Sequence, residues 1–521
     1  MTTTVARPET VAPARPAPPA PPPAATPQPA NWMVPLAVLI TGMFMSVLDV
    51  SIVNVAISTI QVELGGATAD VAWISTAYTL VLGVVVPTSA WLGNRFGLGR
   101  VYTLSLAGFA IASALCGLAW SLNSLIAFRV IQAIPGGLLP AVTLTMVYRI
   151  VPRQKIGTAM GLYGLGIIFA PAIGPTLGGY LVEYVSWRLV FFINVPIAII
   201  GVVAALIALP KFPAMRTERF DVWGFVTVAT GMVALLLAFS EGASWGWTSY
   251  RVLILITGGT LMLALFVVIE LQVDHPLLDL RVFRYRAYTI SLIVMSVMMT
   301  GLFATLFYVP LFLQAGQGYP ALSAGLLIFP QALVMGFLMP IAGRLYDRIG
   351  PRWLAVTGLL IAAYGSYLLA GINPDMTRSE VVLWTCIRAG GVGLAMMPIM
   401  TGGIAALSHD LTTTGSAINT VAQRVSAALG LAGLTAMATA QQAELAASRA
   451  ALLHASSSQA AQLHFTQLFG LYRRTQLAVL ANSYSNVFLL TAVTTVVAAG
   501  IALLLRSGPT EHSESAAVPM E

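Results

Sequence analysis

Fourteen long apolar stretches follow one another between residues 34 and 506. A helix that crosses a membrane needs roughly 20 mostly apolar residues, and each stretch has about that length. The predicted spans cover residues 34–57, 72–92, 101–120, 124–148, 157–182, 189–209, 223–240, 252–271, 288–313, 322–343, 353–371, 381–406, 415–438 and 486–506. Glycine and proline recur inside them, as in membrane helices, whereas a membrane barrel would show short alternating strands. The pattern predicts an all-α integral membrane protein with 14 transmembrane helices and both termini on one side.

The composition excludes a soluble globular protein. Hydrophobic residues make up 58% and charged residues 9% of the 521 residues, whereas a soluble domain carries about 25% charged residues to cover its surface. Ten prolines crowd into residues 1–30, which predicts a disordered tail rich in proline and alanine before the first span. Residues 507–521 form a second predicted tail, and we expect both tails in the cytoplasm.

The basic residues predict this orientation. With the termini assigned to the cytoplasm, seventeen of the 26 Lys and Arg residues fall in the inner tails and connections, and six fall in the outer ones. This excess follows the positive-inside rule. We therefore interpret the formal net charge of +7 as the orientation signal of a multi-pass plasma-membrane protein, and not as a sign of nucleic-acid binding.

The chain lacks the residue patterns of several other kinds of chemistry. Its two cysteines, Cys116 and Cys386, and its five scattered histidines show no metal-ligand spacing. It contains no glycine-rich phosphate loop and no Gly-x-Ser-x-Gly nucleophile motif. We therefore expect no cofactor and no ATP motor, and these absences disfavour an intramembrane enzyme or a sensor that has lost transport.

A short motif recurs after the second and the tenth predicted span. The first copy runs from Leu92 to Gly97 and the second from Leu345 to Gly350, 253 residues later (347 − 94). Internal repeats of this kind build secondary transporters, whose substrate site lies near the middle of the membrane between two halves.

The spacing of the repeat predicts how the chain is divided. An N-terminal six-helix bundle covers residues 31–210, two extra central helices cover 211–280, and a C-terminal six-helix bundle covers 281–506. The second bundle includes one long outer loop, residues 439–485. The Ala, Gln and Leu content of this loop suggests an amphipathic helix on the membrane surface.

The repeated motif resembles the inner-loop signature of the major facilitator superfamily, Gly-x-Leu-x-Asp-Arg-x-Gly. The second copy fits from Gly343 onward, whereas the first has Ala90 for the glycine and Asn94 for the acid. The resemblance implies that the acid takes part in a charge switch between conformations, and we expect Asn94 to keep the hydrogen bonds of the acid but not its charge. The implied gating residues are Asn94, Arg95, Gly97, Arg100, Asp347, Arg348 and Gly350.

Four further motifs resemble the fourteen-span drug:proton antiporter branch of that superfamily. The segment LDVSIVNVAI in the first span contains Asp49, and RVIQAIPGG in the fourth span contains Arg129. The segment SWRLVFFINVPI follows the fifth span, which carries the Gly-Pro-x-x-Gly-Gly pattern associated with exporters. This pattern comprises Gly174, Pro175, Gly178 and Gly179. Small residues and proline at these positions predict either a hinge and leak-tight seam or static close packing.

Asp49 is the acid that lies deepest in a predicted span, and ionisable groups at membrane depth are costly and functional by default. Asp49 lies roughly 22 Å above the inner end of its span, and Arg129 roughly 8 Å below the outer end of its own. In a core of about 30 Å these depths coincide. We predict a direct or water-bridged Asp49–Arg129 couple for proton coupling. The alternatives are a helix-packing hydrogen bond for Asp49 and a tie to backbone carbonyls for Arg129.

Polar, aromatic, methionine and arginine side chains on other turns and spans are candidates for an adaptable substrate cavity. They are Asn54, Gln132, Tyr78, Tyr163, Phe307, Met397, Arg388 and Arg424. Most aromatic residues and methionines in a membrane protein instead face lipid or pack the bundle. Glu183 and Glu241 are two further acids, near the outer ends of their spans.

These observations favour proton-linked export. A carboxylate that titrates near neutrality inside the membrane can exchange its proton for a substrate, especially a cationic one. We expect a monomer, surrounded by membrane lipids, that exports amphipathic or cationic drugs and lipophilic compounds in exchange for protons. The alternative is a dedicated exporter of one endogenous product, such as a metabolite, an antibiotic, a siderophore or a lipid.

Overall fold

The computed structural model describes residues 31–210, 220–274, 276–408, 411–455 and 465–505, and every regular element in these ranges is a helix. The two predicted tails and the segment 211–219 lie outside the described residues. Thirteen helices are long and apolar enough to cross a membrane, or 14 if one bent pair is counted as a single span. The predicted all-α membrane fold is therefore confirmed.

The N-terminal half consists of helices α1 to α8. Their bounds are α1 Met33–Leu64, α2 Thr68–Val85, α3 Thr88–Phe96, α4 Leu98–Gly117, α5 Leu122–Ile150, α6 Ile156–Tyr184, α7 Leu189–Phe192 and α8 Asn194–Ala208. The helix α5 begins with a capping box in which Ser121 and Ser124 satisfy each other's backbone amides, so its start is set locally.

The second predicted span, 72–92, differs from the structure because it is broken into α2 and α3. The two helices meet at an angle of 57°. Pro87 lies in the break, and a proline cannot donate the backbone hydrogen bond that would continue α2. The predicted sixth span, 189–209, is confirmed as one apolar span, Leu189–Ala208, in which Ile193 between α7 and α8 keeps helical backbone angles.

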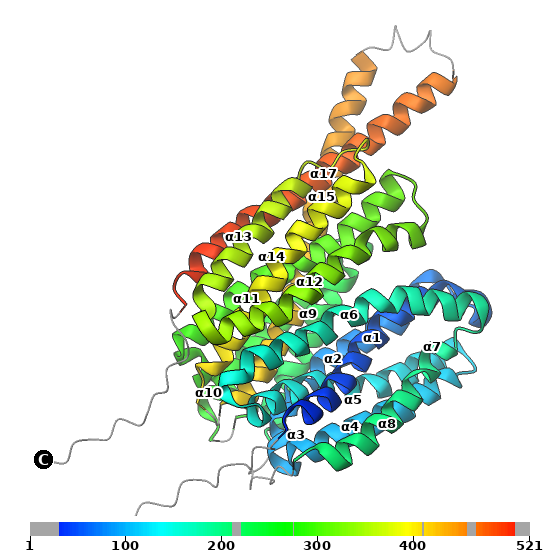
Figure 1. The fold of residues 1–521 in the computed structure, drawn as a ribbon. Helices are drawn as coiled ribbons and strands as arrows, with labels where there is room; N and C mark the ends of the chain where they lie inside the picture. The colour runs from blue at the N-terminus through cyan, green and yellow to red at the C-terminus, as the bar shows by residue number, and fades with distance from the viewer. Residues whose placement is uncertain (1–30, 211–219, 275, 409–410, 456–464, 506–521) are drawn as a thin grey trace, which may run out of the picture.

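The C-terminal half consists of α11 to α17. Their bounds are α11 Arg286–Leu311, α12 Ala321–Ile349, α13 Pro351–Leu369, α14 Arg378–Ala405, α15 Thr412–Ala455 and α17 Phe465–Ala502. A short π-helical segment, Phe312–Gly316, follows α11. Figure 1 shows the two halves side by side, and α6 of the first half packs along α12 of the second.

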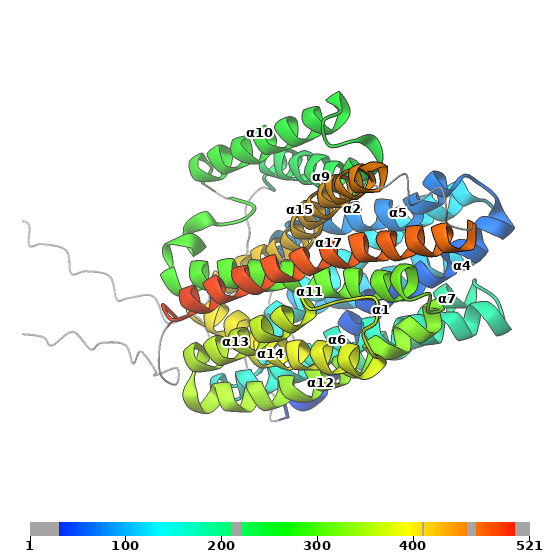
Figure 2. The ribbon, with the colours of Figure 1, turned by 90° about the horizontal axis from the view of Figure 1, so that it is seen from above.

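The extra pair, α9 Val222–Trp245 and α10 Tyr250–Gln272, lies at the edge of the molecule (Figure 2). The helix α9 packs against α2 of the first half and α15 of the second, and α10 packs against α9. Most of α10 is therefore left uncovered by protein, as expected for a helix that faces lipid. This pair joins the two bundles without entering either of them.

The region 439–485 differs from the predicted surface loop. The helices α15 and α17 continue through most of it and project beyond the other helices at one end (Figure 1). The segment of α15 after residue 438 contains neither glycine nor proline, so no residue there stops the helix that begins in the span.

Candidate functional site

Asp49 on α1 and Arg129 on α5 are in direct contact inside the N-terminal half. The distance from Arg129 Nη1 to Asp49 Oδ2 is 2.5 Å. The exposed fractions of the two side chains are 0% and 1%, so water does not screen the pair. The structure thus brings together the two residues whose depths coincide in the sequence, and it does so directly rather than through a water molecule.

Three further side chains complete the hydrogen bonding of the pair. Gln132 Nε2 and Asn194 Nδ2 donate to Asp49 Oδ1 over 3.0 and 3.1 Å. Both amides also donate to Ser113 Oγ, each over 3.1 Å, and Arg129 Nη1 donates to Gln132 Oε1 over 2.8 Å. Both carboxylate oxygens of Asp49 therefore accept hydrogen bonds, and these bonds join α1, α5 and α8 at one point.

Tyr78 on α2 covers the other face of this network. Arg129 Cζ lies 3.7 Å from the centroid of the Tyr78 ring, which is a cation–π contact. The Tyr78 hydroxyl group is buried and has no hydrogen-bond partner among the described residues. Of the predicted cavity residues, Gln132 and Tyr78 therefore belong to the Asp49–Arg129 network itself.

Sequence reasoning did not identify Ser113 on α4 and Asn194 at the start of α8. Asn194 lies within the SWRLVFFINVPI segment, so the resemblance pointed to this segment but did not indicate that Asn194 contacts Asp49. Ser113 is one small polar residue in an apolar span, and such residues often donate to their own helix instead. Here its hydroxyl group donates to Phe191 O over 2.9 Å, which ties α4 to α7 below the network.

The exporter-like motif packs α6 against α1 directly beside Asp49. A Cβ atom at Gly178 would lie 2.9 Å from Ile52 Cγ1 and 3.0 Å from Ile52 O. Gly174 faces Ser51 in the same way. Pro175 is exposed on the opposite side of α6, and a Cβ atom at Gly179 would meet nothing within 4 Å. Only Gly174 and Gly178 therefore form the seam with α1.

This asymmetry gives a matched pair of variants. Gly178→Ala is expected to destabilise the protein by about 1–3 kcal/mol, because its methyl group must displace the Ile52 backbone. Gly179→Ala is expected to be neutral or slightly stabilising, because it only removes the flexibility of a helical glycine. Unfolding of the purified variants in detergent would measure both, and equal stabilities would contradict the proposed seam.

The second copy of the inner-loop motif joins the two halves. Asp347 on α12 accepts hydrogen bonds from Gly157 N over 2.9 Å, from Thr158 N over 3.1 Å and from Thr158 Oγ1 over 3.0 Å. These groups lie at the N-terminus of α6, where free backbone amides favour a negative charge. Gly343 and Gly157 pack directly against each other at the same level. Asp347 is thus an interhelical cap that holds α6 against α12.

The first copy of the motif makes no such cap. Asn94 Oδ1 is buried without a partner among the described residues, so the expectation that Asn94 keeps the hydrogen bonds of the acid is wrong for this oxygen. Arg95, Arg100 and, in the second copy, Arg348 are exposed. Gly97 and Gly350 have positive φ angles of 86° and 77°, which explains why glycine ends both copies.

Removing the Asp347 charge should loosen the seam between the halves. Asp347→Asn weakens the cap on α6 by about 0.5–2 kcal/mol. The seam between α6 and α12 should therefore open more often. A cysteine that replaces the buried Met339 in this seam should then react with a maleimide about fivefold faster than it does when Asp347 is intact. The background would have both native cysteines replaced by serine. Arg348→Gln, next to Asp347 but exposed, is the matched control, and equal labelling rates in the two variants would contradict the cap.

The remaining predicted cavity residues are spread over several places. Tyr163 and Met397 are buried in the central core between the halves. Asn54 is exposed and accepts a hydrogen bond from Ser75 Oγ over 2.8 Å, and Phe307 is 43% exposed. Arg424 on α15 is half-buried. Arg388 lies inside the C-terminal half, away from the Asp49 network.

The acids near the predicted outer ends have few contacts. Glu183 is exposed, and Glu241 accepts a hydrogen bond from Ser244 Oγ over 2.8 Å. Glu63, which sequence reasoning missed, accepts from Trp187 Nε1 over 2.7 Å and from Arg188 Nη1 over 3.2 Å. This contact joins the C-terminal end of α1 to the residues that precede α7, and in the sequence only the Trp-Arg pair of the SWRL segment marked this place.

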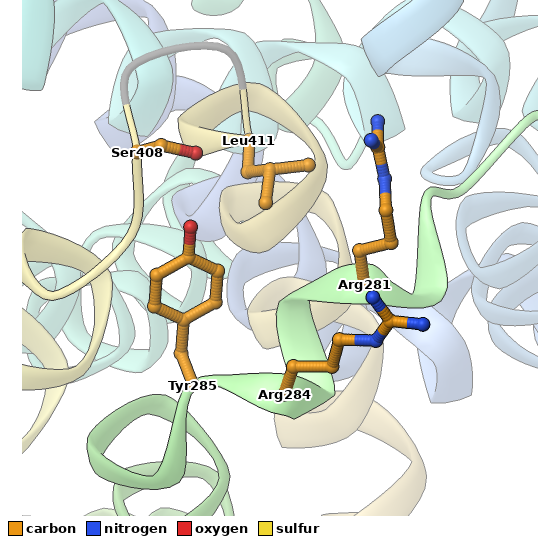
Figure 3. A pocket seen from close by; sticks show the side chains of 5 residues that line it. All are labelled: Arg281, Arg284, Tyr285, Ser408 and Leu411. Atoms are coloured by element: carbon orange, nitrogen blue, oxygen red, sulfur yellow. The ribbon is translucent and has the colours of Figure 1, made fainter.

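A separate pocket of about 260 Å³ lies near the predicted cytoplasmic end (Figure 3). Its lining residues are Arg281, Arg284, Tyr285, Ser408 and Leu411. Burial alone would raise the pKa of the neighbouring Asp279 carboxyl group, but its bonds from Arg281 hold that pKa below the ordinary value. The pocket shares no residue with the Asp49 network.

Two helical halves joined by an extra pair, with a buried carboxylate–arginine network in one half, define a secondary transporter. The chain belongs to the Major Facilitator Superfamily, whose family model matches residues 39–431. This confirms the family to which the sequence motifs pointed.

Relatives and solved structures agree with this assignment. The chain is 34% identical over 409 residues to an uncharacterized MFS-type transporter, YhcA, of Bacillus subtilis (strain 168), covering 78% of this chain and 77% of that one. It is 31% identical over 408 residues to the tetracenomycin C resistance and export protein of Streptomyces glaucescens, covering 77% and 75%. The proton:xylose symporter XylE has the same fold, with a TM-score of 0.58 at 13% identity over 89% of this chain and 95% of that one.

Proposed function

We propose that the protein is a proton-coupled antiporter that exports amphipathic, lipophilic compounds by alternating access. It acts as a monomer in the plasma membrane, with both termini in the cytoplasm. The observation that carries this proposal is the fully buried Asp49, whose two oxygens are held by Arg129, Gln132 and Asn194. The family and the fold are those of membrane transporters, which are not in general enzymes.

The chemistry of the network suits exchange of a proton for a substrate. Arg129 and the two amides bind the Asp49 carboxylate, and a proton that adds to this carboxylate competes with those contacts. Protonation of Asp49 leaves Arg129 without its counter-charge, and arginine cannot release its own proton. Asp49 therefore either carries a proton or keeps its ion pair with Arg129, but not both. Coupling of proton movement to transport requires two such mutually exclusive states.

Two contacts supply the conformational part of the proposal. The seam of Gly174 and Gly178 links α6 to α1 beside Asp49, and the Asp347 cap links α6 to α12. The helix α6 thus contacts both the coupling site and the opposite half. A change in the charge of Asp49 can reach the interface between the halves through this helix, and the Asp347 cap would open when the cytoplasmic side opens.

The proposal is tested by an efflux panel in a drug-sensitive host. Cells with and without the protein are loaded with lipophilic dyes and with natural products, and efflux is followed before and after a proton uncoupler is added. Export that stops with the uncoupler supports the proposal, whereas uncoupler-insensitive or absent efflux across the panel overturns it.

A dedicated exporter of one natural product is the second candidate. The relative named a tetracenomycin C resistance and export protein favours it, because it is similar over 77% of this chain. The same panel separates the two candidates: a dedicated exporter moves one chemical class, and a multidrug exporter moves several.

A further inference from the structure

Arg388 on α14 is a buried arginine with a single hydrogen bond. Its exposed fraction is 3%, and Nε donates to Ser366 Oγ on α13 over 2.9 Å. The guanidinium group carries five N–H donors, and its terminal nitrogens have no acceptor among the described residues. The Asp49 network makes no use of this side chain.

Arg388 occupies a place in the C-terminal half like that of Arg129 in the N-terminal half, although the two arginines are 259 residues apart (388 − 129). Ser366 follows Ser113 by 253 residues, which is also the offset between the two inner-loop motifs (366 − 113 and 347 − 94). The helix α13 packs against α14 as α4 packs against α5. In each half, therefore, a serine on one helix lies beside a buried arginine on the next: Ser366 bonds Arg388 directly, and Ser113 reaches Arg129 through Gln132.

The C-terminal half lacks the acid of the N-terminal network. The repeat offset of 253 residues places the counterpart of Asp49 at Leu302 (49 + 253), and the neighbouring Gly301 is the residue of α11 that faces Arg388. A Cβ atom at Gly301 would lie 2.9 Å from Arg388 Nη2, with Thr491 and Thr495 of α17 within 4.0 Å. A side chain at this position would point at the guanidinium group, but glycine provides none.

The helices that pack around Arg388 offer no other counter-charge. Among their described residues, α11, α13 and α17 contain neither Asp nor Glu. The one acid of α14, Glu380, lies in its first turn and accepts from Thr377 N over 2.7 Å. Asp347 of α12 is occupied by the cap on α6, and α15 contributes a second cation, Arg424, in its membrane-spanning part.

An uncompensated guanidinium group inside a membrane bundle is expensive, and it cannot be relieved by loss of a proton. The remaining way to neutralise it is an anion from outside the chain. Its planar donors match a carboxylate in particular, and they also suit a compact halide.

We propose that Arg388 and Ser366 form a binding site for a monovalent anion, which enters through the place that Gly301 leaves open. The anion is either the acidic group of a transported compound or free chloride. The first source rests on the proposed export function and makes acid-bearing lipophilic compounds better substrates than cationic ones, in contrast to the expectation from Asp49 alone. The second source does not depend on that function.

Two binding experiments without a proton gradient test the site in the purified full-length protein. In the first, melting temperature is followed while chloride replaces isethionate at constant ionic strength. In the second, binding of the fluorescent dansylaminoundecanoic acid is compared with that of its methyl ester in chloride-free buffer. Each is performed on the wild type, on Arg388→Met and on Gly301→Asp, which supplies the missing carboxylate from within.

The wild type is expected to be stabilised by chloride, or to bind the acid at least about tenfold more tightly than the ester. Both Arg388→Met and Gly301→Asp should lose this preference. A response in the chloride arm alone identifies a free halide site, and a response in the acid arm identifies a substrate group. In chloride-free buffer, Gly301→Asp should melt at a higher temperature than Gly301→Asn, because only Asp neutralises Arg388.

The proposal is overturned if neither arm responds in the wild type, or if the variants respond as the wild type does. Because no proton gradient is present in these binding experiments, their failure would not bear on whether the protein exports compounds in exchange for protons. Conversely, uncoupler-insensitive efflux would overturn the antiport function without changing anion binding at Arg388.

Discussion

In inverted membrane vesicles, Asp49→Asn is expected to reduce substrate-dependent proton release to the level of vesicles that lack the protein. The amide has nearly the shape of the carboxylate and still accepts a hydrogen bond from Arg129, so the fold should persist. It cannot bind and release a proton in the physiological range, however, so a proton can no longer be exchanged for a substrate. A pH-sensitive dye inside the vesicles would measure the release after substrate is added.

The matched control is Glu63→Gln, which removes an acid from the same helix at its outer end. Glu63 is about half exposed and its partner Arg188 is partly exposed, so the contact is screened by water. Coupling should survive this change. Coupling that persists in Asp49→Asn, or that is lost equally in both variants, would remove Asp49 from the mechanism.

The second large effect is expected for Arg129→Met. Met fills much of the same volume but leaves the Asp49 carboxylate buried without its counter-charge, which costs about 3–5 kcal/mol when one partner of a buried pair is removed. The variant should therefore be markedly less stable than the wild type. Unfolding of the purified protein in detergent would measure the difference.

A double variant separates charge from packing at this site. Adding Asp49→Asn to Arg129→Met removes the stranded carboxylate, so the double variant should regain much of the stability lost by the single one. Arg188→Met, which breaks the exposed contact with Glu63, should cost no more than about 1 kcal/mol. A double variant as unstable as Arg129→Met would mean that packing, rather than charge, is the main contribution of Arg129.

The two halves of the molecule use the same framework with different charges. In the N-terminal half, Arg129 is neutralised by Asp49 on α1. In the C-terminal half, Arg388 faces Gly301 on α11. Among the described residues, the buried arginine of the first half thus has a carboxylate partner, whereas Arg388 has none.

Much of this could be predicted from the sequence. Hydropathy indicated the number of spans because an apolar stretch of membrane length has no other stable environment. The depths of Asp49 and Arg129 followed from the rise of a helix, which is the same in every span. The break in the second span, in contrast, depended on whether Pro87 bends or ends the helix, and packing decides between these outcomes.

Two residues of the Asp49–Arg129 network, Ser113 and Asn194, could not be identified from the sequence. Ser113 and Asn194 are single small polar residues in apolar segments, and many such residues bond only to their own helix. Their convergence on Asp49 depends on how α4 and α8 rotate about their axes and pack on α1. Depth along a helix can be counted from the chain, but the direction in which a side chain points across the bundle cannot.

The sequence by itself thus determined the class of protein, its spans and the depth of its one deeply buried acid, because these follow from hydrophobicity and from helical rise. Only the tertiary structure decided which charges are paired. It placed Asp347 on the N-terminus of α6, left Asn94 Oδ1 without a partner among the described residues, and put Ser366 rather than an acid beside Arg388. Pairing is decided between helices that are far apart in the chain, and the free energy of a buried charge depends on that pairing.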